Sequence, residues 1–183
     1  MKFVNPIKDA RKIEALKKYL KERNERDYML FLLGIHFGLR ISDLLSLRIE
    51  DVVGKKYIII KEKKTGKIKS FPVAEVVQRE LESYLKGRTK GWLFLSREKS
   101  GATPITRQQA YNVLSDAAKA VGIKDPIGTH TLRKTFGYWA CKQGTSLELI
   151  QKILNHSSPG VTLRYIGITQ DQINSVYKKL KFK

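Results

Sequence analysis

The feature that most constrains the fold is a single pair of β-rich runs inside an otherwise helical chain. Residues 57–60 read Tyr-Ile-Ile-Ile, and Ile68, Phe71 and Val73 mark a second run. The segment between them, residues 64–67, reads Lys-Thr-Gly-Lys and is typical of a turn. We therefore expect one antiparallel β-hairpin near the middle of the chain, which is too few strands for a barrel or a doubly wound sheet.

Helical periodicity covers most of the remaining chain. Ile13, Leu16 and Leu20 recur at helical spacing, with lysines on the opposite face. Capping residues and breaks divide the pattern into helices expected at residues 8–23, 25–37, 74–86, 106–121, 131–144, 146–154 and 170–179, with a short helix capped by Ser42 and another, after a break at Pro159, carrying Tyr165. Residues 92–95 are expected to be a short strand or extended. The predicted fold class is mainly α with a small antiparallel β-sheet, an α+β domain.

Charge is the strongest indication of a partner. The 183 residues suit one domain, and 42% of them are apolar, enough for a hydrophobic core. Lysine and arginine number 36 against 17 acidic residues, which gives a net charge of +19. Self-repulsion of this size is relieved by a polyanion. Nucleic acid is the first expected partner and an anionic membrane surface the second; an unusually basic protein without such a partner is the alternative.

Several classes of protein are excluded. Cys141 is the only cysteine, so neither an intrachain disulfide nor a thiolate-rich metal site can form. The N-terminal segment lacks the apolar stretch of a signal peptide. The longest apolar patch, residues 28–39, is interrupted by glycine and histidine and is too short to span a bilayer. We expect a cytoplasmic protein without membrane association.

Residues 130–133 read His-Thr-Leu-Arg. In a helix that begins here, the imidazole of His130 and the guanidinium of Arg133 lie one turn apart. The unpaired N–H groups of a helix N-terminus favour an anion such as phosphate. The alternative is an ordinary capped helix with a surface arginine.

Arg40 lies among apolar residues, in the segment GLRISD. A buried guanidinium needs a carboxylate or a phosphate as its partner. Asp43 is the carboxylate expected to pair with it. This pair is either purely structural, or Asp43 orients Arg40 toward the phosphate of a ligand.

The predicted hairpin is strongly basic. Its five lysines face one acid, Glu62; they are Lys61, Lys63, Lys64, Lys67 and Lys69. Such lysines either guard a solvated strand edge against aggregation or reach into a DNA groove. Lys64, at the turn, is the one placed to reach a phosphate ester.

His156 and Tyr165 lie in the segment LNHSSPGVTLRY. His156 follows an apolar helix face and is readily explained as a histidine at a helix end. Tyr165, taken alone, is readily explained as a packed aromatic residue. Neither residue indicates chemistry by itself.

Together, these segments resemble the tyrosine recombinases, the family of phage integrases and chromosome-dimer-resolving recombinases. The segments that carry the resemblance, in order, are GLRISDLLSL, the KTGK hairpin, HTLRKTF and LNHSSPGVTLRY. The gap of 23 residues from Arg133 to His156 and of nine from His156 to Tyr165 also match the family. The resemblance extends from about residue 7 to residue 170 and implies the catalytic-domain fold of that family.

The resemblance implies a role for each matching residue. Tyr165 corresponds to the nucleophile, and Arg40 and Arg133 correspond to the two phosphate-binding arginines. Lys64 corresponds to the hairpin lysine that acts as general acid. His130 corresponds to the general acid–base.

Two further positions match, and the chemistry agrees with the set. His156 occupies the second histidine position, which is histidine or tryptophan in the family. Asp43 occupies the acidic position three residues after the first arginine.

A tyrosine hydroxyl has a pKa near 10, so attack at neutral pH needs a base and a positive field, which His130 and the arginines supply. The phosphotyrosyl bond retains the energy of the DNA bond, so no ATP, metal or other cofactor is expected. The sequence has neither a phosphate-binding loop for ATP nor a carboxylate cluster for magnesium.

Other basic side chains are expected to bind the phosphates of double-stranded DNA: Lys61, Lys63, Lys67, Lys69, Arg107 and Lys134. The family resemblance implies a homotetramer on DNA. Mutual repulsion predicts a monomer when DNA is absent.

The expected organisation is a single catalytic domain over residues 1–183. The N-terminal core-binding domain of most family members is not part of this sequence, which is either a fragment or a short recombinase. Residues 170–183 are interpreted either as a tail exchanged between protomers or as an ordinary packed final helix.

The expected function is site-specific DNA recombination through a 3′-phosphotyrosyl intermediate, in a bacterial or phage-encoded protein that associates with the nucleoid. A non-catalytic DNA-binding accessory protein or regulator on the same fold is one alternative. A type IB topoisomerase, which uses the same cleavage without a partner strand, is another. An unrelated RNA-binding protein ranks last because no aromatic pattern of RNA-binding domains is present.

Overall fold

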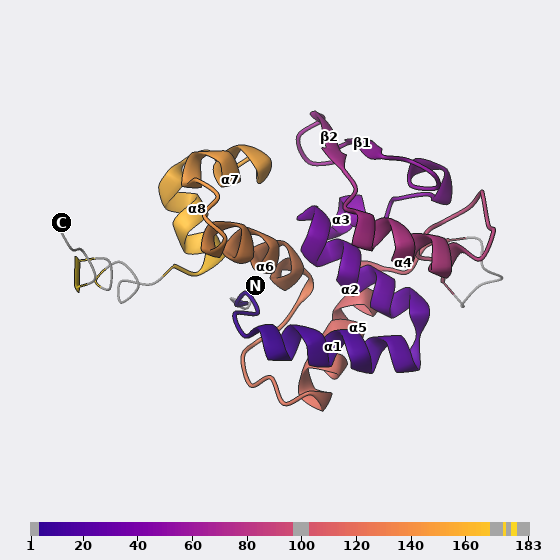
Figure 1. Ribbon diagram of the computed structural model, residues 1–183, viewed down its shortest axis with the longest axis horizontal. Coiled ribbons are helices and arrows are strands. Elements are labelled where there is room, and N and C mark those ends of the chain that lie inside the picture. Colours follow the sequence, from indigo (N-terminus) through magenta and orange to yellow (C-terminus); the bar gives the residue numbers. More distant parts are fainter. Residues whose placement is uncertain (1–3, 97–102, 169–173, 175–176, 179–183) are drawn as a thin grey trace.

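The structure is a computed structural model that describes residues 4–96, 103–168, 174 and 177–178. Its elements in chain order are α1 (Ala10–Arg23), α2 (Glu25–Phe37), α3 (Ile41–Leu44), a 3₁₀ helix (Ile49–Asp51), β1 (Tyr57–Lys61), β2 (Ile68–Pro72), α4 (Glu75–Leu85), α5 (Arg107–Ala120), α6 (Thr129–Lys142), α7 (Leu147–Ile153) and α8 (Pro159–Ile166). The predicted class, mainly helical with one small antiparallel sheet, is confirmed (Figure 1).

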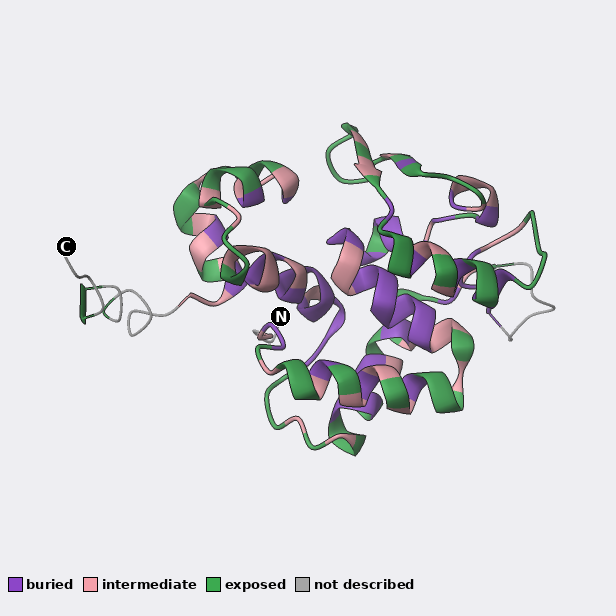
Figure 2. Cartoon of the chain, in the orientation of Figure 1, coloured by how far each residue is buried: buried purple, intermediate pink, exposed green. Residues whose placement is uncertain are grey.

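The main hydrophobic core forms around α2. This helix carries a nearly unbroken run of buried apolar side chains and packs against α1, α4 and α6. Gly34 lets α6 approach closely, because a Cβ there would lie 2.3 Å from Cδ1 of Leu132. Figure 2 shows α2 buried along most of its length, while α1 and α4 keep exposed outer faces.

A second, smaller core joins the C-terminal helices to α6. This core consists of four buried residues: Tyr138 of α6, Ile150 of α7, Leu154 at the end of α7 and Ile166 of α8. Figure 1 shows α7 and α8 as a separate layer against α6, beside the body formed by the earlier helices. Helix α6 therefore belongs to both cores, and residues on it can face both layers.

The hairpin projects from the edge of the molecule above α3 and α4 (Figure 1). Its register pairs Tyr57 with Pro72 and Lys61 with Ile68. Ile58 faces the core and is fully buried, whereas Ile59 is 66% exposed. This alternation is the period of two expected of a strand with one buried face.

Most predicted elements are confirmed within about two residues, and a few details differ. The N-cap of α3 is Arg40 and not Ser42. Pro159 is the first residue of α8 and not a break before it, because proline is well tolerated in the first turn. Residues 92–95 form isolated bridges but no strand. The expected helix over 170–179 falls on a segment of which only residues 174, 177 and 178 are described.

Candidate active site

A contact between Gly128 and Thr131 caps the N-terminus of helix α6. The Gly128 N–H donates to Oγ1 of Thr131 at 3.1 Å, and the helix starts at Thr129. His130 and Arg133 consequently lie one turn apart at its N-terminal end, as the sequence predicts.

Arg133 is not a surface residue: it is 2% exposed. One terminal nitrogen, Nη1, donates to the carbonyl of Gly38 at 2.6 Å, and Nη2 donates to the carbonyl of Leu154. These carbonyls lie at the C-terminal ends of α2 and α7. Arg133 therefore fastens the two layers together at the point where the predicted site residues meet.

The predicted partner of Arg40 is wrong. Its Nη1 lies 2.9 Å from Oε1 of Glu62, and Oδ1 of Asp43 instead accepts the backbone N–H of Lys63 at 3.0 Å. Glu62 is fully buried. Burial raises the pKa of its carboxyl group, but the contacts from Thr65, Arg40 and Asn155 outweigh it, so the net pKa is lowered and the group is charged.

Glu62 is the residue that our sequence reasoning missed. In the sequence it stands out only as the one acid in a basic hairpin that is expected to be solvated. Ile58, Ile60 and Glu62 are alternate residues, so their side chains point to the same face of the strand, which is the face turned toward the core. That alternation was the available signal that the carboxylate points inward.

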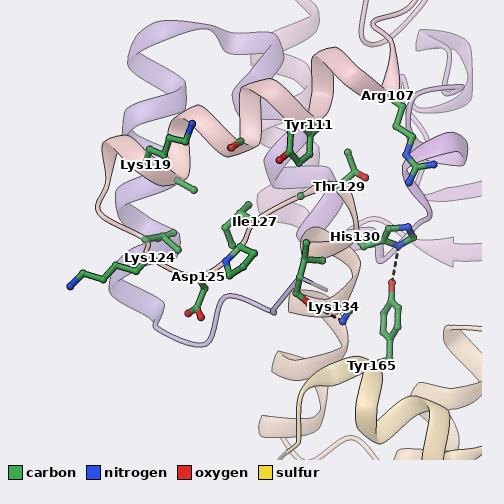
Figure 3. A pocket seen from close by; sticks show the side chains of 16 residues that line it. Arg107, Tyr111, Lys119, Lys124, Asp125, Ile127, Thr129, His130, Lys134 and Tyr165 are labelled. Carbon is green, nitrogen blue, oxygen red and sulfur yellow. Dashed lines mark hydrogen bonds between the residues drawn. The ribbon is translucent and has the colours of Figure 1, made fainter. Parts of the chain in front are cut away.

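Tyr165 lies on α8 and faces the start of α6 (Figure 3). Its hydroxyl is 3.5 Å from Nδ1 of His130. Burial raises the pKa of the phenol above its ordinary value, and the positive charges of Arg133 and Arg40 partly oppose this. The hydroxyl is thus protonated at neutral pH and has a ring nitrogen within reach.

Both histidines favour their neutral forms. His156 contacts Tyr165 edge-on, with ring centroids 4.7 Å apart, and its Nδ1 is 3.1 Å from Oγ1 of Thr162. Burial, with Arg133 and Arg40 nearby, lowers the pKa of His156 to about 4. Burial and the neighbouring cations also lower the pKa of His130. At neutral pH His130 can accept a proton, as a general base must.

The hairpin lysines divide into two groups. Lys64 is exposed at the turn, and Lys61, Lys63 and Lys67 are exposed as well. Lys69 instead turns inward, and its Nζ is buried without a hydrogen-bond partner among the described residues. Burial and the charge of Arg133 lower the pKa of Lys69 to about 8. The structure therefore brings Lys69, rather than Lys64, near the two arginines.

We expect Lys69→Met to raise the free energy of unfolding by about 1–2 kcal/mol at pH 7 while weakening DNA binding. At this pH, below about 8, the buried ammonium is still charged and carries the full cost of its burial. Thermal unfolding checks the result, with Lys64→Met as the exposed control that changes stability by less than about 0.5 kcal/mol. A loss of stability in Lys69→Met would contradict this interpretation.

Two other predicted DNA contacts occupy different environments. Arg107 is exposed at the start of α5. Lys134 is only 6% exposed; its Nζ donates to the carbonyl of Val4 at 2.8 Å and lies 5.2 Å from the centre of the Tyr165 ring. Lys134 thus lies behind the tyrosine and not on an open surface.

A cavity of about 780 Å³ adjoins Tyr165 and His130 (Figure 3). Its walls come from α5, the loop that follows it and the start of α6. Basic side chains contribute to the lining: Arg107, Lys119, Lys124 and Lys134. A positively charged recess therefore leads to the tyrosine hydroxyl, which suits a phosphate-bearing chain.

Close packing of α8 on α6 depends on Gly137. A Cβ at this position would lie 2.6 Å from Cγ2 of Ile166 and 3.2 Å from Cδ1 of Leu154. We expect Gly137→Ala to lower the free energy of unfolding by about 1–3 kcal/mol and to slow any reaction of Tyr165. The matched control is Gly160→Ala in α8, where a Cβ meets nothing within 4 Å and stability should be kept or raised. Equal thermal stability of the two variants would contradict this packing argument.

Within the described ranges, no group of three or more His, Cys, Asp or Glu side chains could hold a metal ion. No described helix is both long enough and apolar enough to cross a membrane.

Comparison with known proteins identifies the family. The sequence model of the phage integrase family matches residues 8–172. The chain is 43% identical over 178 residues to the probable integrase/recombinase YoeC of Bacillus subtilis, covering 97% of each. It is 29% identical to tyrosine recombinase XerA of Pyrococcus horikoshii, over 86% of this chain but only 56% of that protein. The chain thus matches YoeC along nearly its whole length but spans about half of the tyrosine recombinase.

Solved structures confirm the predicted fold. A crystal structure of XerA recombinase superposes with a TM-score of 0.78 at 22% identity, covering 97% of this chain and 65% of that one. The catalytic domain of bacteriophage HP1 integrase superposes with a TM-score of 0.64 at 20% identity, covering 97% and 95%. Because the family model matches residues 8–172 and the chain is 43% identical to a probable integrase/recombinase over nearly its whole length, the chain belongs to the phage integrase family.

Proposed function

We propose that this chain cuts and rejoins double-stranded DNA as a site-specific recombinase, through a covalent bond between Tyr165 and the 3′-phosphate of the cut strand. The observation that carries the proposal is that the Tyr165 hydroxyl lies 3.5 Å from Nδ1 of His130 and within the positive field of Arg133 and Arg40, although these residues come from different elements. The names of the relatives, integrase and tyrosine recombinase, support the same chemistry.

The reaction begins with the scissile phosphate between Arg40 and Arg133. Guanidinium groups bind its non-bridging oxygens and stabilise the negative charge that develops on them, without a metal ion. Arg133 is preorganised for this by its bonds to two backbone carbonyls. The Tyr165 hydroxyl then attacks phosphorus as its proton passes to His130, whose Nδ1 is 3.5 Å away.

Cleavage is completed when the bond from phosphorus to the 5′-oxygen breaks and that oxygen takes up a proton. The family resemblance assigns this proton to Lys64, which lies exposed on the hairpin turn of the DNA-free protein. The hairpin must therefore close over the DNA to deliver it. Attack by the 5′-hydroxyl of a partner strand on the phosphotyrosyl bond reverses the steps and joins the strands, so ATP is not needed.

Binding of the duplex relies on positive charge around the site. The proposed direct phosphate contacts are the exposed Lys61, Lys63, Lys67 and Arg107. Lys69 and Lys134, whose nitrogens are buried or bonded to the backbone, are proposed to contribute positive charge from behind the surface. Because each contact releases counterions, the affinity should fall steeply as salt increases. We further propose that the protein acts in the cytoplasm, as a monomer that assembles into a tetramer on DNA, with residues 170–183 as a candidate link between protomers.

The test is covalent trapping. Nicked duplexes made from DNA flanking the chain's own gene are incubated with the protein in EDTA, and the reaction is quenched in SDS. We expect a slowly migrating protein–DNA adduct. Salt-sensitive binding without an adduct would instead favour a non-catalytic accessory protein, and relaxation of any supercoiled plasmid without a defined site would favour a topoisomerase.

A further inference from the structure

Glu62 is an unusual carboxylate because it is fully buried in the most basic part of the chain. It stands at the end of β1, where its backbone closes the hairpin: its N–H donates to the carbonyl of Lys67 at 2.9 Å, and its carbonyl accepts the N–H of Gly66 at 2.8 Å. An ionised carboxylate at such a position is retained only if its oxygens have partners.

Its partners come from three separate parts of the fold. Oε1 lies 2.9 Å from Nη1 of Arg40, at the start of α3. Oε2 accepts the hydroxyl of Thr65, in the hairpin turn, at 2.7 Å and the side-chain amide of Asn155, in the loop between α7 and α8, also at 2.7 Å. One carboxylate therefore joins a phosphate-binding arginine, the hairpin and the loop before the nucleophile helix.

The contact with Asn155 connects Glu62 to Tyr165 through the neighbouring residue His156. Asn155 has φ of +48°, a left-handed conformation that asparagine tolerates better than most residues. The next residue, His156, contacts the ring of Tyr165. The amide bond to Glu62 therefore helps to set the conformation of the loop that presents His156.

We propose that Glu62 is a positioning residue, which orients Arg40 toward the scissile phosphate and ties the hairpin to the His156 loop so that these parts of the site are arranged together. This inference rests on the proposed function. Because Oε1 of Glu62 pairs with Nη1 of Arg40, the other N–H groups of Arg40 are left to bind phosphate. A displacement of about 1 Å in such a group can cost about 100-fold in rate.

The effect of removing the Glu62 charge on DNA binding distinguishes a positioning role from general stabilisation of the fold. Glu62 is the negative group beside Arg40, and Lys69 and Arg133 lie close to it. Removing its charge should therefore leave DNA affinity unchanged or increase it, even as misplacement of Arg40 slows the chemistry. A residue that merely stabilised the fold would change binding and cleavage in the same direction.

The first experiment compares Glu62→Gln with the exposed control Glu75→Gln in single-turnover cleavage and in DNA binding. We expect Glu62→Gln to cleave about 10–100-fold more slowly with equal or tighter binding. Asn155→Gly, which removes the amide but keeps the left-handed backbone, should cleave about 3–10-fold more slowly. Unchanged cleavage in Glu62→Gln, or weaker binding in parallel with slower cleavage, would overturn the proposal.

A double-mutant cycle tests whether Glu62 acts through Arg40. If it does, Glu62→Gln combined with Arg40→Met should cleave only as slowly as Arg40→Met alone. Fully multiplicative losses would show two independent roles and overturn the assignment.

Hydrogen exchange on the DNA-free protein tests, without requiring activity, whether Glu62 holds the hairpin and the loop at Asn155 together. Amides of the hairpin and of the loop at Asn155 should exchange faster in Glu62→Gln than in the wild type or in Glu75→Gln. Unchanged exchange would overturn the proposal that Glu62 links these two segments. Absence of an adduct from the wild type, by contrast, would count against the proposed function, so the two failures are distinguishable.

Discussion

Replacing Tyr165 by phenylalanine is expected to reduce adduct formation by at least about 10⁴-fold, to below detection. The substitution removes the only atom proposed to attack phosphorus and keeps the ring against His156, 4.7 Å away between centroids. The lost hydroxyl contact with His130, at 3.5 Å, is long, so stability should change by less than about 1 kcal/mol. DNA affinity should also be retained.

Tyr138→Phe is the matched control. Tyr138 is buried in the second core, and its ring lies 5.9 Å from that of Trp139 and 5.4 Å from Nζ of Lys8, neither of which is a proposed reacting group. This variant should form the adduct at a rate close to that of the wild type. Adduct formation by Tyr165→Phe at a measurable rate would show that another residue is the nucleophile.

Arg133→Met is expected to show the largest combined loss. The two backbone carbonyls that it satisfies, at Gly38 and Leu154, would be left buried without a donor, which should lower the free energy of unfolding by about 2–5 kcal/mol. Cleavage by the remaining folded protein should fall by about 10²–10⁴-fold, because the phosphate loses a preorganised cation.

Denaturant unfolding and single-turnover cleavage separate the two effects of Arg133. Arg164→Met is the control: Arg164 is exposed on α8, one residue from the tyrosine, and its loss should change stability by less than about 0.5 kcal/mol. Stability of Arg133→Met equal to that of Arg164→Met would contradict the role of Arg133 as the fastening between the layers.

Local signals were enough to predict most of the elements. Apolar periodicity predicts α1, and the observed bounds of α2, Glu25–Phe37, coincide with the expected ones. The side chains of Thr106 and Ser146 cap α5 and α7, as their positions before helical runs indicate. The hairpin follows from two β-rich runs and a turn signal.

Contacts between distant residues could not be read from the same patterns. Proximity in sequence favoured Asp43 as the partner of Arg40, but the fold brings Glu62, 22 residues away, against it. Likewise, the sequence cannot distinguish the exposed Lys64 from Lys69, whose Nζ is buried, because this difference depends on how the hairpin packs on the arginines. The motif predicts which residues act, whereas the tertiary contacts show which residues hold them in place.

The measurement that tests the account most directly is the identification of the covalent bond itself. The trapped adduct is digested with protease and nuclease, and the peptide that retains a nucleotide remnant is sequenced by mass spectrometry. The account predicts a peptide containing Tyr165, joined through its phenolic oxygen to a 3′-phosphate and formed equally well in EDTA. A remnant on any other residue, a bond to a 5′-phosphate, or cleavage that leaves no protein attached to the DNA would contradict it.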